Sequence, residues 1–207
     1  MPRIARDLQD NLIYHVLNRG NGQQEVFHEN GDYAAFIQLM REAKKLYEVK
    51  IFGYCLMPNH FHLVLSPIKG EELSQWMQWL MISHVRRYHK YHGKSGHIWQ
   101  GRFKSFAIEE DNHFLMVLRY VEANPVRAGL VSLAKDWPWS SHKDRIEENK
   151  DSLIDDIPLE LPPKWDSFVN EPLAGRELEK IRRSVNRQLP YGEAKWQLKI
   201  RKEENKE

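Results

Sequence analysis

The chain has 207 residues, of which 41% are hydrophobic and 29% charged, and its formal net charge is +2. This composition is that of a soluble globular protein, and no apolar stretch approaches the roughly 20 residues that a membrane-spanning helix needs. The start of the chain lacks the apolar core of a secretory signal, and the single cysteine has no partner for an internal disulfide, so we expect a cytoplasmic protein without a membrane segment.

The first part of the chain predicts a strand, a helix and a hairpin. Residues 11–19 alternate as a strand does, and apolar residues repeat at helical spacing over 33–47. Two short β-rich runs, 50–57 and 61–67, are separated by Pro58-Asn59. A proline-asparagine pair between two such runs is typical of a tight bend.

The next part adds a helix, a strand and another helix. Helical spacing covers 71–91, a β-rich run covers 103–109, and Asp111 is a candidate N-cap for a helix that ends before Pro125. The resulting order of elements predicts an α+β fold, namely a ferredoxin-like antiparallel sheet with helices packed on one face.

Composition divides the chain into three parts. Residues 1–145 would form the main domain, 146–173 an acidic, proline-rich connection, and 174–207 a basic helical element with a tail. We expect 201–207 to be disordered, because these residues are mixed in charge and poor in apolar side chains.

A long stretch of the chain carries no acidic residue. Between Glu72 and Glu109 basic residues are interleaved with aromatic ones. Cations for phosphates and flat rings for bases are typical of a surface that binds single-stranded nucleic acid. The alternative is a solvated helix face above core aromatics. The basic residues of this stretch are Arg86, Arg87, Lys90, Lys94, Arg102 and Lys104.

Two histidines form an H-x-H pair at the start of the second β-rich run. His60 and His62 are two residues apart, so in a strand their side chains point to the same face. Two converging imidazoles can bind a divalent cation, which can polarise a phosphodiester for attack by a hydroxyl. The commoner role of such a pair is structural, as buried and hydrogen-bonded histidines.

A tyrosine and an asparagine are spaced one helical turn apart. Tyr120 and Asn124 would place a phenol and an amide on one helix face. The phenol has an ordinary pKa near 10, so its attack on phosphorus needs a cation nearby. A ligand set of two histidines and an amide does not discriminate between magnesium and manganese. Alternatively, the pair is a half-buried aromatic and a residue at a helix end.

Several sequence blocks occur together over about residues 12 to 142. They are Tyr14-His-Val-Leu-Asn-Arg-Gly-Asn21, Tyr54-Cys-Leu-Met-Pro-Asn-His-Phe-His62, Gly96-His-Ile-Trp-Gln-Gly-Arg-Phe-Lys-Ser105, Arg119-Tyr-Val-Glu-Ala-Asn-Pro-Val-Arg-Ala-Gly-Leu-Val131 and Trp137-Pro-Trp-Ser-Ser141. In these blocks and their order the chain resembles the REP-associated tyrosine transposases of bacteria, which belong to the HUH class of single-tyrosine transposases.

The resemblance implies a function and a set of site residues. His60, His62 and Asn124 would bind Mg²⁺ or Mn²⁺, and Tyr120 would be the nucleophile. The implied activity is that of a metal-dependent single-stranded DNA endonuclease and strand transferase, which acts on DNA hairpins of REP type through a 5′-phosphotyrosine intermediate. Classical relatives have glutamine as the third ligand, and asparagine is typical of the REP-associated group.

Contacts to DNA are expected from residues of these blocks and of the stretch without acidic residues between Glu72 and Glu109. They are Arg19, Asn21, Arg86, Arg87, Lys90, Trp99, Gln100, Arg102 and Lys104. The alternatives are a non-catalytic DNA-hairpin-binding protein derived from a transposase and an RNA-processing metallonuclease. The sequence leaves the oligomeric state open between monomer and homodimer.

Overall fold

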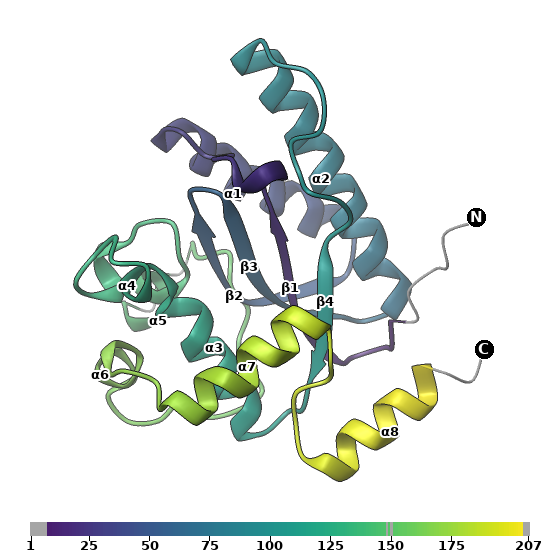
Figure 1. Cartoon of the computed structure of the whole chain (residues 1–207), viewed down its shortest axis with the longest axis vertical. Helices are drawn as coiled ribbons and strands as arrows, with labels where there is room; N and C mark the ends of the chain where they lie inside the picture. The colour runs from purple at the N-terminus through teal and green to yellow at the C-terminus, as the bar shows by residue number, and fades with distance from the viewer. Residues whose placement is uncertain (1–7, 148, 150, 205–207) are drawn as a thin grey trace.

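The fold is a four-stranded antiparallel sheet with helices around it (Figure 1). The computed structural model describes residues 8–147, 149 and 151–204. Its elements in chain order are β1 (Ile13–Arg19), η1 (Asn21–Gln23), α1 (Asn30–Leu46), β2 (Val49–Met57), β3 (His60–Pro67), α2 (Gly70–His92), β4 (Lys104–Ile108), α3 (Asn112–Glu122), α4 (Asn124–Arg127), η2 (Ala134–Asp136), α5 (His142–Ile146), α6 (Trp165–Asn170), α7 (Gly175–Arg187) and α8 (Ala194–Glu204). None of the helices within the described residues is long and apolar enough to cross a bilayer.

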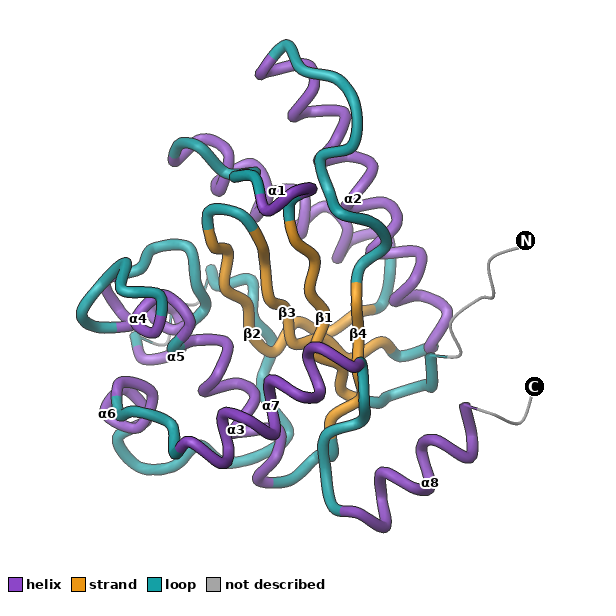
Figure 2. The backbone as a smooth tube through the Cα atoms, in the orientation of Figure 1, coloured by secondary structure: helices purple, strands orange, loops and turns teal. Residues whose placement is uncertain are grey.

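The strand order confirms the predicted topology. Across the sheet the order is β2-β3-β1-β4, and every neighbouring pair is antiparallel. With α1 after β1 and α2 after β3, this is the βαββαβ arrangement of a ferredoxin-like fold. Figure 2 shows the four strands side by side. The antiparallel pairing brings the end of β1 and the starts of β3 and β4 to the same end of the sheet.

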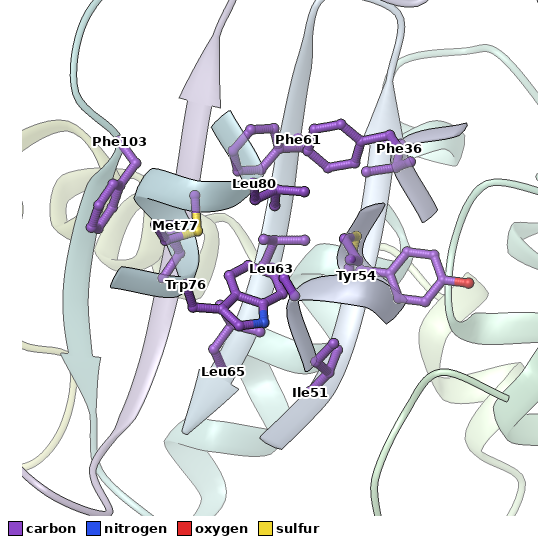
Figure 3. Packing of buried hydrophobic residues seen from close by; sticks show 14 of the residues in the cluster. Phe36, Ile51, Tyr54, Phe61, Leu63, Leu65, Trp76, Met77, Leu80 and Phe103 are labelled. Carbon is purple, nitrogen blue, oxygen red and sulfur yellow. The ribbon is translucent and has the colours of Figure 1, made fainter. Parts of the chain in front are cut away.

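One face of the sheet packs against α1 and α2, as the sequence predicts. Phe61, Leu63 and Leu65 alternate along β3 and are fully buried in this layer. Figure 3 shows them beneath Trp76 and Leu80 of α2. Each large apolar side chain buried in this way stabilises the fold by about 1.5–3 kcal/mol. The remaining positions of β3, which include both histidines of the H-x-H pair, therefore face the other side of the sheet.

A further helix, α3, covers that other face, which the prediction of helices on one face did not include. Val64 of β3 packs there with Phe114, Val117 and Leu118 of α3 in a second cluster of buried side chains. The physical reason is that the central strands are apolar on both faces, so the second face also needs a cover. The C-terminal end of α3 is thereby held against the sheet.

A buried carboxylate anchors that end of α3. Glu122 is the last residue of α3 and is completely buried. Its two oxygens accept four hydrogen bonds at 2.8–2.9 Å. The donors are Ser141 Oγ, His142 Nδ1, Arg145 Nε and Trp165 Nε1. One side chain thus joins α3 to α5, to α6 and to the Trp137–Ser141 block.

The charges in this network stabilise one another. Burial alone would raise the pKa of Glu122, but the charge of Arg145 and the hydrogen bond from His142 outweigh burial and lower it to about 2. Burial would likewise lower the pKa of His142, whereas the carboxylates of Glu122 and Asp166 raise it. The network is a compact ionic cluster below the helix end that carries Tyr120.

The C-terminal part packs against the sheet. Tyr191 hydrogen-bonds along β4, because its N–H donates to the carbonyl of Ala107 and its carbonyl accepts from the N–H of Glu109. Ile200 of α8 is almost fully buried in the cluster that also contains α1 and α2. The expected disorder of 201–207 is therefore wrong for 201–204, which belong to α8, and 205–207 lie outside the described residues. The division into three parts stays a prediction.

Replacing Glu122 by alanine should destabilise the protein strongly. The variant leaves Arg145 as a charge without its carboxylate, and Trp165 and Ser141 lose their acceptor. We expect the free energy of unfolding to fall by about 3–5 kcal/mol, measured by urea denaturation. The matched control is Glu147→Ala, because Glu147 is exposed and its ion pair with Lys143 is long at 4.0 Å. An equal loss in both variants would show that the buried network does not anchor α3.

Candidate active site

A cavity of about 520 Å³ lies at the end of the sheet where β1 ends and β3 and β4 begin. His60, His62, Tyr120 and Asn124 all line it. These four residues come from β3, α3 and α4, and they were predicted as one site from the sequence. The fold therefore brings together every predicted metal-ligating and nucleophilic side chain.

The two histidines are held by hydrogen bonds on one side of their rings. Their ring centroids are 5.0 Å apart and the rings are nearly perpendicular. Nδ1 of His60 lies 2.7 Å from Asn59 Oδ1, to which it donates, and Nδ1 of His62 lies 2.8 Å from Nε2 of His15. With Nδ1 engaged in both rings, Nε2 is the nitrogen left to bind a ligand in the cavity.

All three histidines of this group are neutral at physiological pH. Burial lowers the pKa of His15 to about 3, and burial together with the charge of Arg19 lowers that of His60 to about 4. Burial also lowers the pKa of His62 well below its ordinary value. A neutral imidazole is the form that binds a metal, so no proton has to be removed before binding.

Tyr120 and Asn124 enter the cavity from either side of a helix break. Tyr120 lies in the last turn of α3, and its ring is perpendicular to that of His62 with 5.9 Å between centroids. Asn124 opens α4, with Pro125 at its start as the sequence predicts. Ala123 still donates its N–H to the carbonyl of Arg119, so the turn between the two helices is kept. The one-turn spacing therefore survives the break.

The amide of Asn124 has an unfilled hydrogen-bonding capacity. Asn124 is 9% exposed, and its Nδ2 is buried without a partner among the described residues. Buried polar atoms normally have a partner, because leaving one unpaired costs about 1–3 kcal/mol. Because Nδ2 is a donor, only a ligand that offers an acceptor oxygen would offset this cost.

The sequence analysis missed three residues of the site. His15 lies behind His62, and Arg127 and Arg182 line the cavity from α4 and α7. The guanidinium of Arg127 lies 4.1 Å from the ring centroid of Tyr120. Strand alternation could have placed His15 on one face of its strand, and Arg127 follows Asn124 by less than one turn. For Arg182 the sequence offers no more than a place in a basic helix.

Four of the residues predicted to contact DNA lie at the cavity. Arg19, Gln100, Arg102 and Lys104 all line it. The N–H of Gln100 donates to the carbonyl of Arg19, which ties the two segments together. The predicted residues that do not line the cavity are Asn21, Arg86, Arg87, Lys90 and Trp99.

Those five residues have different surroundings. Arg86 lines a second groove of about 840 Å³ between α2 and residues 96–103, and Lys90 is exposed further along α2. Arg87 is engaged with Asp32 at 3.3 Å, and Asn21 donates its N–H to the carbonyl of Ile98.

Trp99 belongs to the core. It is 6% exposed, and its ring packs against Phe61 and His84 with 5.2 Å between centroids in each case. The structure therefore gives this tryptophan a packing role, although it also lines the second groove.

A second group of possible metal-ligating side chains lies away from the cavity. Glu109, Asp111 and His113 bring ligand atoms within 4.8 Å of one another between β4 and α3. One oxygen of Asp111 accepts from the N–H and Nδ1 of His113, and one oxygen of Glu109 accepts from the N–H of Glu193. These contacts give the group a structural role at the start of α3.

The sequence matches one family model over most of the sheet domain. The model is described as "Transposase IS200 like", and the match covers residues 8–124. The chain belongs to this family. The matched region includes β1 to β4 and all four predicted metal-ligating and nucleophilic residues, of which Asn124 is its last residue.

Two curated relatives of this transposase-family chain confirm the resemblance found in its sequence blocks. A putative REP-associated tyrosine transposase of Haemophilus influenzae is 31% identical over 110 residues, which are 47% of this chain and 62% of the relative. A REP-associated tyrosine transposase of Escherichia coli is 26% identical over 114 residues, 52% of this chain and 66% of the relative. The chain thus spans less than two thirds of the length of either relative.

A solved structure shares the fold. It is that of a REP-associated tyrosine transposase bound to a REP hairpin, with a TM-score of 0.60 and 19% sequence identity. The match covers 74% of this chain and 90% of the solved one. At this identity the likeness supports the architecture, and the chemistry has to be argued from the residues of the cavity.

Trp99→Ala should lower stability more than it lowers DNA binding. Removing a large buried aromatic side chain costs about 3–5 kcal/mol of unfolding free energy, measured by urea denaturation. The control is Tyr91→Ala, since Tyr91 is 61% exposed, and its effect should stay below about 1 kcal/mol. A Trp99→Ala protein of unchanged stability but weakened hairpin binding would restore the stacking interpretation.

Proposed function

We propose that this chain is a metal-dependent single-stranded DNA endonuclease and strand transferase of transposase type that acts on DNA hairpins of REP type. The observation that carries the proposal is the meeting of Tyr120 with two neutral histidines and the side chain of Asn124 in one cavity. A nucleophile beside a set of metal-ligating atoms suits phosphoryl transfer.

The donor set of the cavity fits a divalent cation. His60 and His62 would each bind through Nε2, because Nδ1 is taken by Asn59 and His15. Asn124 would bind through its side-chain oxygen. A hydrogen bond at the ring nitrogen that does not bind the metal, here Nδ1, is the arrangement by which proteins orient metal-binding imidazoles. Mg²⁺ or Mn²⁺, when bound, would polarise the phosphodiester and stabilise charge on its oxygens.

The reaction we propose exchanges one phosphoester bond for another. Tyr120 Oη forms a bond to phosphorus, and the bond from phosphorus to the 3′ oxygen breaks. The DNA fragment 3′ of the cut stays attached through its 5′ phosphate as a phosphotyrosine, and the proton lost from the phenol is balanced by the one gained by the 3′-hydroxyl of the other fragment. Because the phosphotyrosine keeps the energy of the broken bond, attack by a 3′-hydroxyl can rejoin strands without another reactant.

Charge supports DNA as the substrate. Arg19, Arg102 and Lys104 line the cavity, and Arg86 and Lys90 lie on α2. Such cations bind phosphates regardless of base sequence. The solved relative was captured with a REP hairpin, which makes a DNA hairpin the first substrate to test. The proposal includes either Mg²⁺ or Mn²⁺ as the cation. It includes either a monomer or a homodimer as the oligomeric state.

Tyr120→Phe should abolish cleavage while binding is retained. The variant keeps the ring against His62 and removes the attacking oxygen. With labelled single-stranded hairpin libraries and Mn²⁺, we expect wild-type protein to form a covalent adduct with the DNA 3′ of the cut. We expect the variant to form none. Its hairpin affinity should change less than about tenfold, since one neutral hydrogen bond is worth about 0.5–1.5 kcal/mol.

The same assay separates the alternatives. Full cleavage by Tyr120→Phe would reject the proposed nucleophile. Tight hairpin binding without any adduct from the wild type, in either metal, would favour a non-catalytic hairpin-binding protein. Equal cleavage of RNA and DNA hairpins would favour an RNA-processing enzyme.

His15→Leu should weaken metal binding although His15 is not a proposed ligand. The variant removes the hydrogen bond to Nδ1 of His62 and frees that ring to turn. Loss of such a supporting partner typically reduces metal affinity about 10- to 100-fold, measurable by calorimetric titration with Mn²⁺. The matched control is His84→Leu, since His84 is equally buried but packs with Phe36 and Trp99 on the other face. Unchanged Mn²⁺ affinity in His15→Leu, or an equal loss in both variants, would show that His15 does not orient His62 for metal binding.

A further inference from the structure

The cavity concentrates positive charge without any carboxylate. The whole chain is nearly balanced, with 31 lysines and arginines against 29 acidic residues. Among the described residues that line the cavity there is no aspartate or glutamate. The cations that line it are Arg19, Arg102, Lys104, Arg127 and Arg182. A local excess of this kind favours binding of an anion.

Arg127 is the least satisfied of these cations. Both of its terminal nitrogens are buried, and apart from an interaction with the side chain of Tyr120 they have no hydrogen-bond partner among the described residues. Burial lowers the pKa of Arg127, the Tyr120 side chain opposes this effect, and the nearby charge of Arg182 adds to it. A buried guanidinium without a counter-charge is costly unless a ligand supplies one.

The position of Arg127 identifies where that ligand would lie. Its guanidinium covers the Tyr120 ring at 4.1 Å and shares the cavity with both histidines. An anion held by Arg127 is therefore next to the side chain that we propose as nucleophile. The planar fork of a guanidinium can bind two oxygens of one phosphate at once.

We propose that Arg127, assisted by Arg182 of α7, binds the non-bridging oxygens of the phosphodiester that Tyr120 attacks. This inference rests on the proposed function and names a second phosphate-binding element beside the histidines and the amide. While the bond from Tyr120 Oη to phosphorus forms and the bond to the 3′ oxygen breaks, negative charge grows on those oxygens. Arg127 would stabilise that charge by hydrogen bonds and would neither gain nor lose a proton.

The inference gives the C-terminal element a part in the site. Arg182, Val185 and Asn186 of α7 all line the cavity, although they follow the family match by more than fifty residues. Ile181 and Ser184 on the same helix are buried, which fixes the face that α7 turns to the protein. Arg183, by contrast, is exposed and does not line the cavity, so it serves as a matched control.

The first test needs no DNA substrate. Binding of inorganic phosphate to the full chain is measured by calorimetry in EDTA for wild type, Arg127→Gln, Arg127→Lys, Arg182→Gln and Arg183→Gln. We expect a loss of about tenfold or more in affinity for Arg127→Gln, since a hydrogen bond to a charged group is worth about 1.5–3 kcal/mol. Arg182→Gln should lose less, Arg127→Lys should recover part of the loss, and Arg183→Gln should match wild type.

Two results of this titration would overturn the inference. One is equal phosphate affinity in wild type and Arg127→Gln, and the other is the absence of saturable binding by the wild type. Thermal melting of each variant without phosphate shows whether the fold is kept. If Arg127→Gln does not fold, Arg127→Lys and Arg182→Gln carry the comparison.

The second test removes one charge from the DNA. A neutral methylphosphonate replaces the phosphate at the cleavage site of a hairpin that the wild type cuts, and binding is measured in EDTA. Wild type should bind the neutral substrate about tenfold more weakly, whereas Arg127→Gln should discriminate less than about twofold. A structural role of Arg127 would lower both affinities together and leave their ratio unchanged, which would reject the inference.

The two proposals fail in different ways. Cleavage by Tyr120→Phe rejects the nucleophile, whatever the phosphate titration gives. A covalent adduct at Tyr120, together with discrimination that does not depend on Arg127, rejects the anion site alone.

Discussion

The candidate site depends on the buried hydrogen bonds of Glu122. Tyr120 and Asn124 lie two residues to either side of this carboxylate, and Arg127 follows within the next turn. Because Glu122 is bonded to donors from three other segments, the end of α3 cannot rotate or slide without breaking several charged contacts. The hydrogen bonds of Glu122 thereby fix the directions of the Tyr120, Asn124 and Arg127 side chains from the opposite side of the helix.

The sheet holds the other half of the site. His60 and His62 are fixed by the pairing of β3 with β1 and β2, and His15 lies in β1 immediately behind His62. Both halves are therefore parts of rigid elements, and the cavity is the space between them. Burial in this space keeps the imidazoles neutral, which an exposed pair of histidines would not achieve at acidic pH.

Local patterns predicted the sheet and made the four central residues candidates, and the family resemblance implied their roles. Strand alternation put His60 and His62 on one face, and helical spacing kept Tyr120 near Asn124 despite the break at Ala123. Interleaved aromatic and basic residues were a weaker guide. The ring of Trp99 is buried in the core, and Arg87 pairs with Asp32 of α1. Both positions result from tertiary contacts between distant segments, which local patterns do not show. The packing of α3 on the second face of the sheet also depends on contacts between distant segments.

The distribution of ion pairs explains why net charge says little about this molecule. Several carboxylates are buried or half-buried against basic groups outside the cavity lining, as in Asp32 with Arg87, Glu122 with Arg145 and Asp155 with Lys44. These acids neutralise structural cations and leave the cavity lining without a carboxylate. A protein with a formal charge of +2 can therefore present a strongly cationic cavity. The salt dependence of the proposed DNA binding should then follow the number of phosphates that these cations contact, because each contact releases counterions.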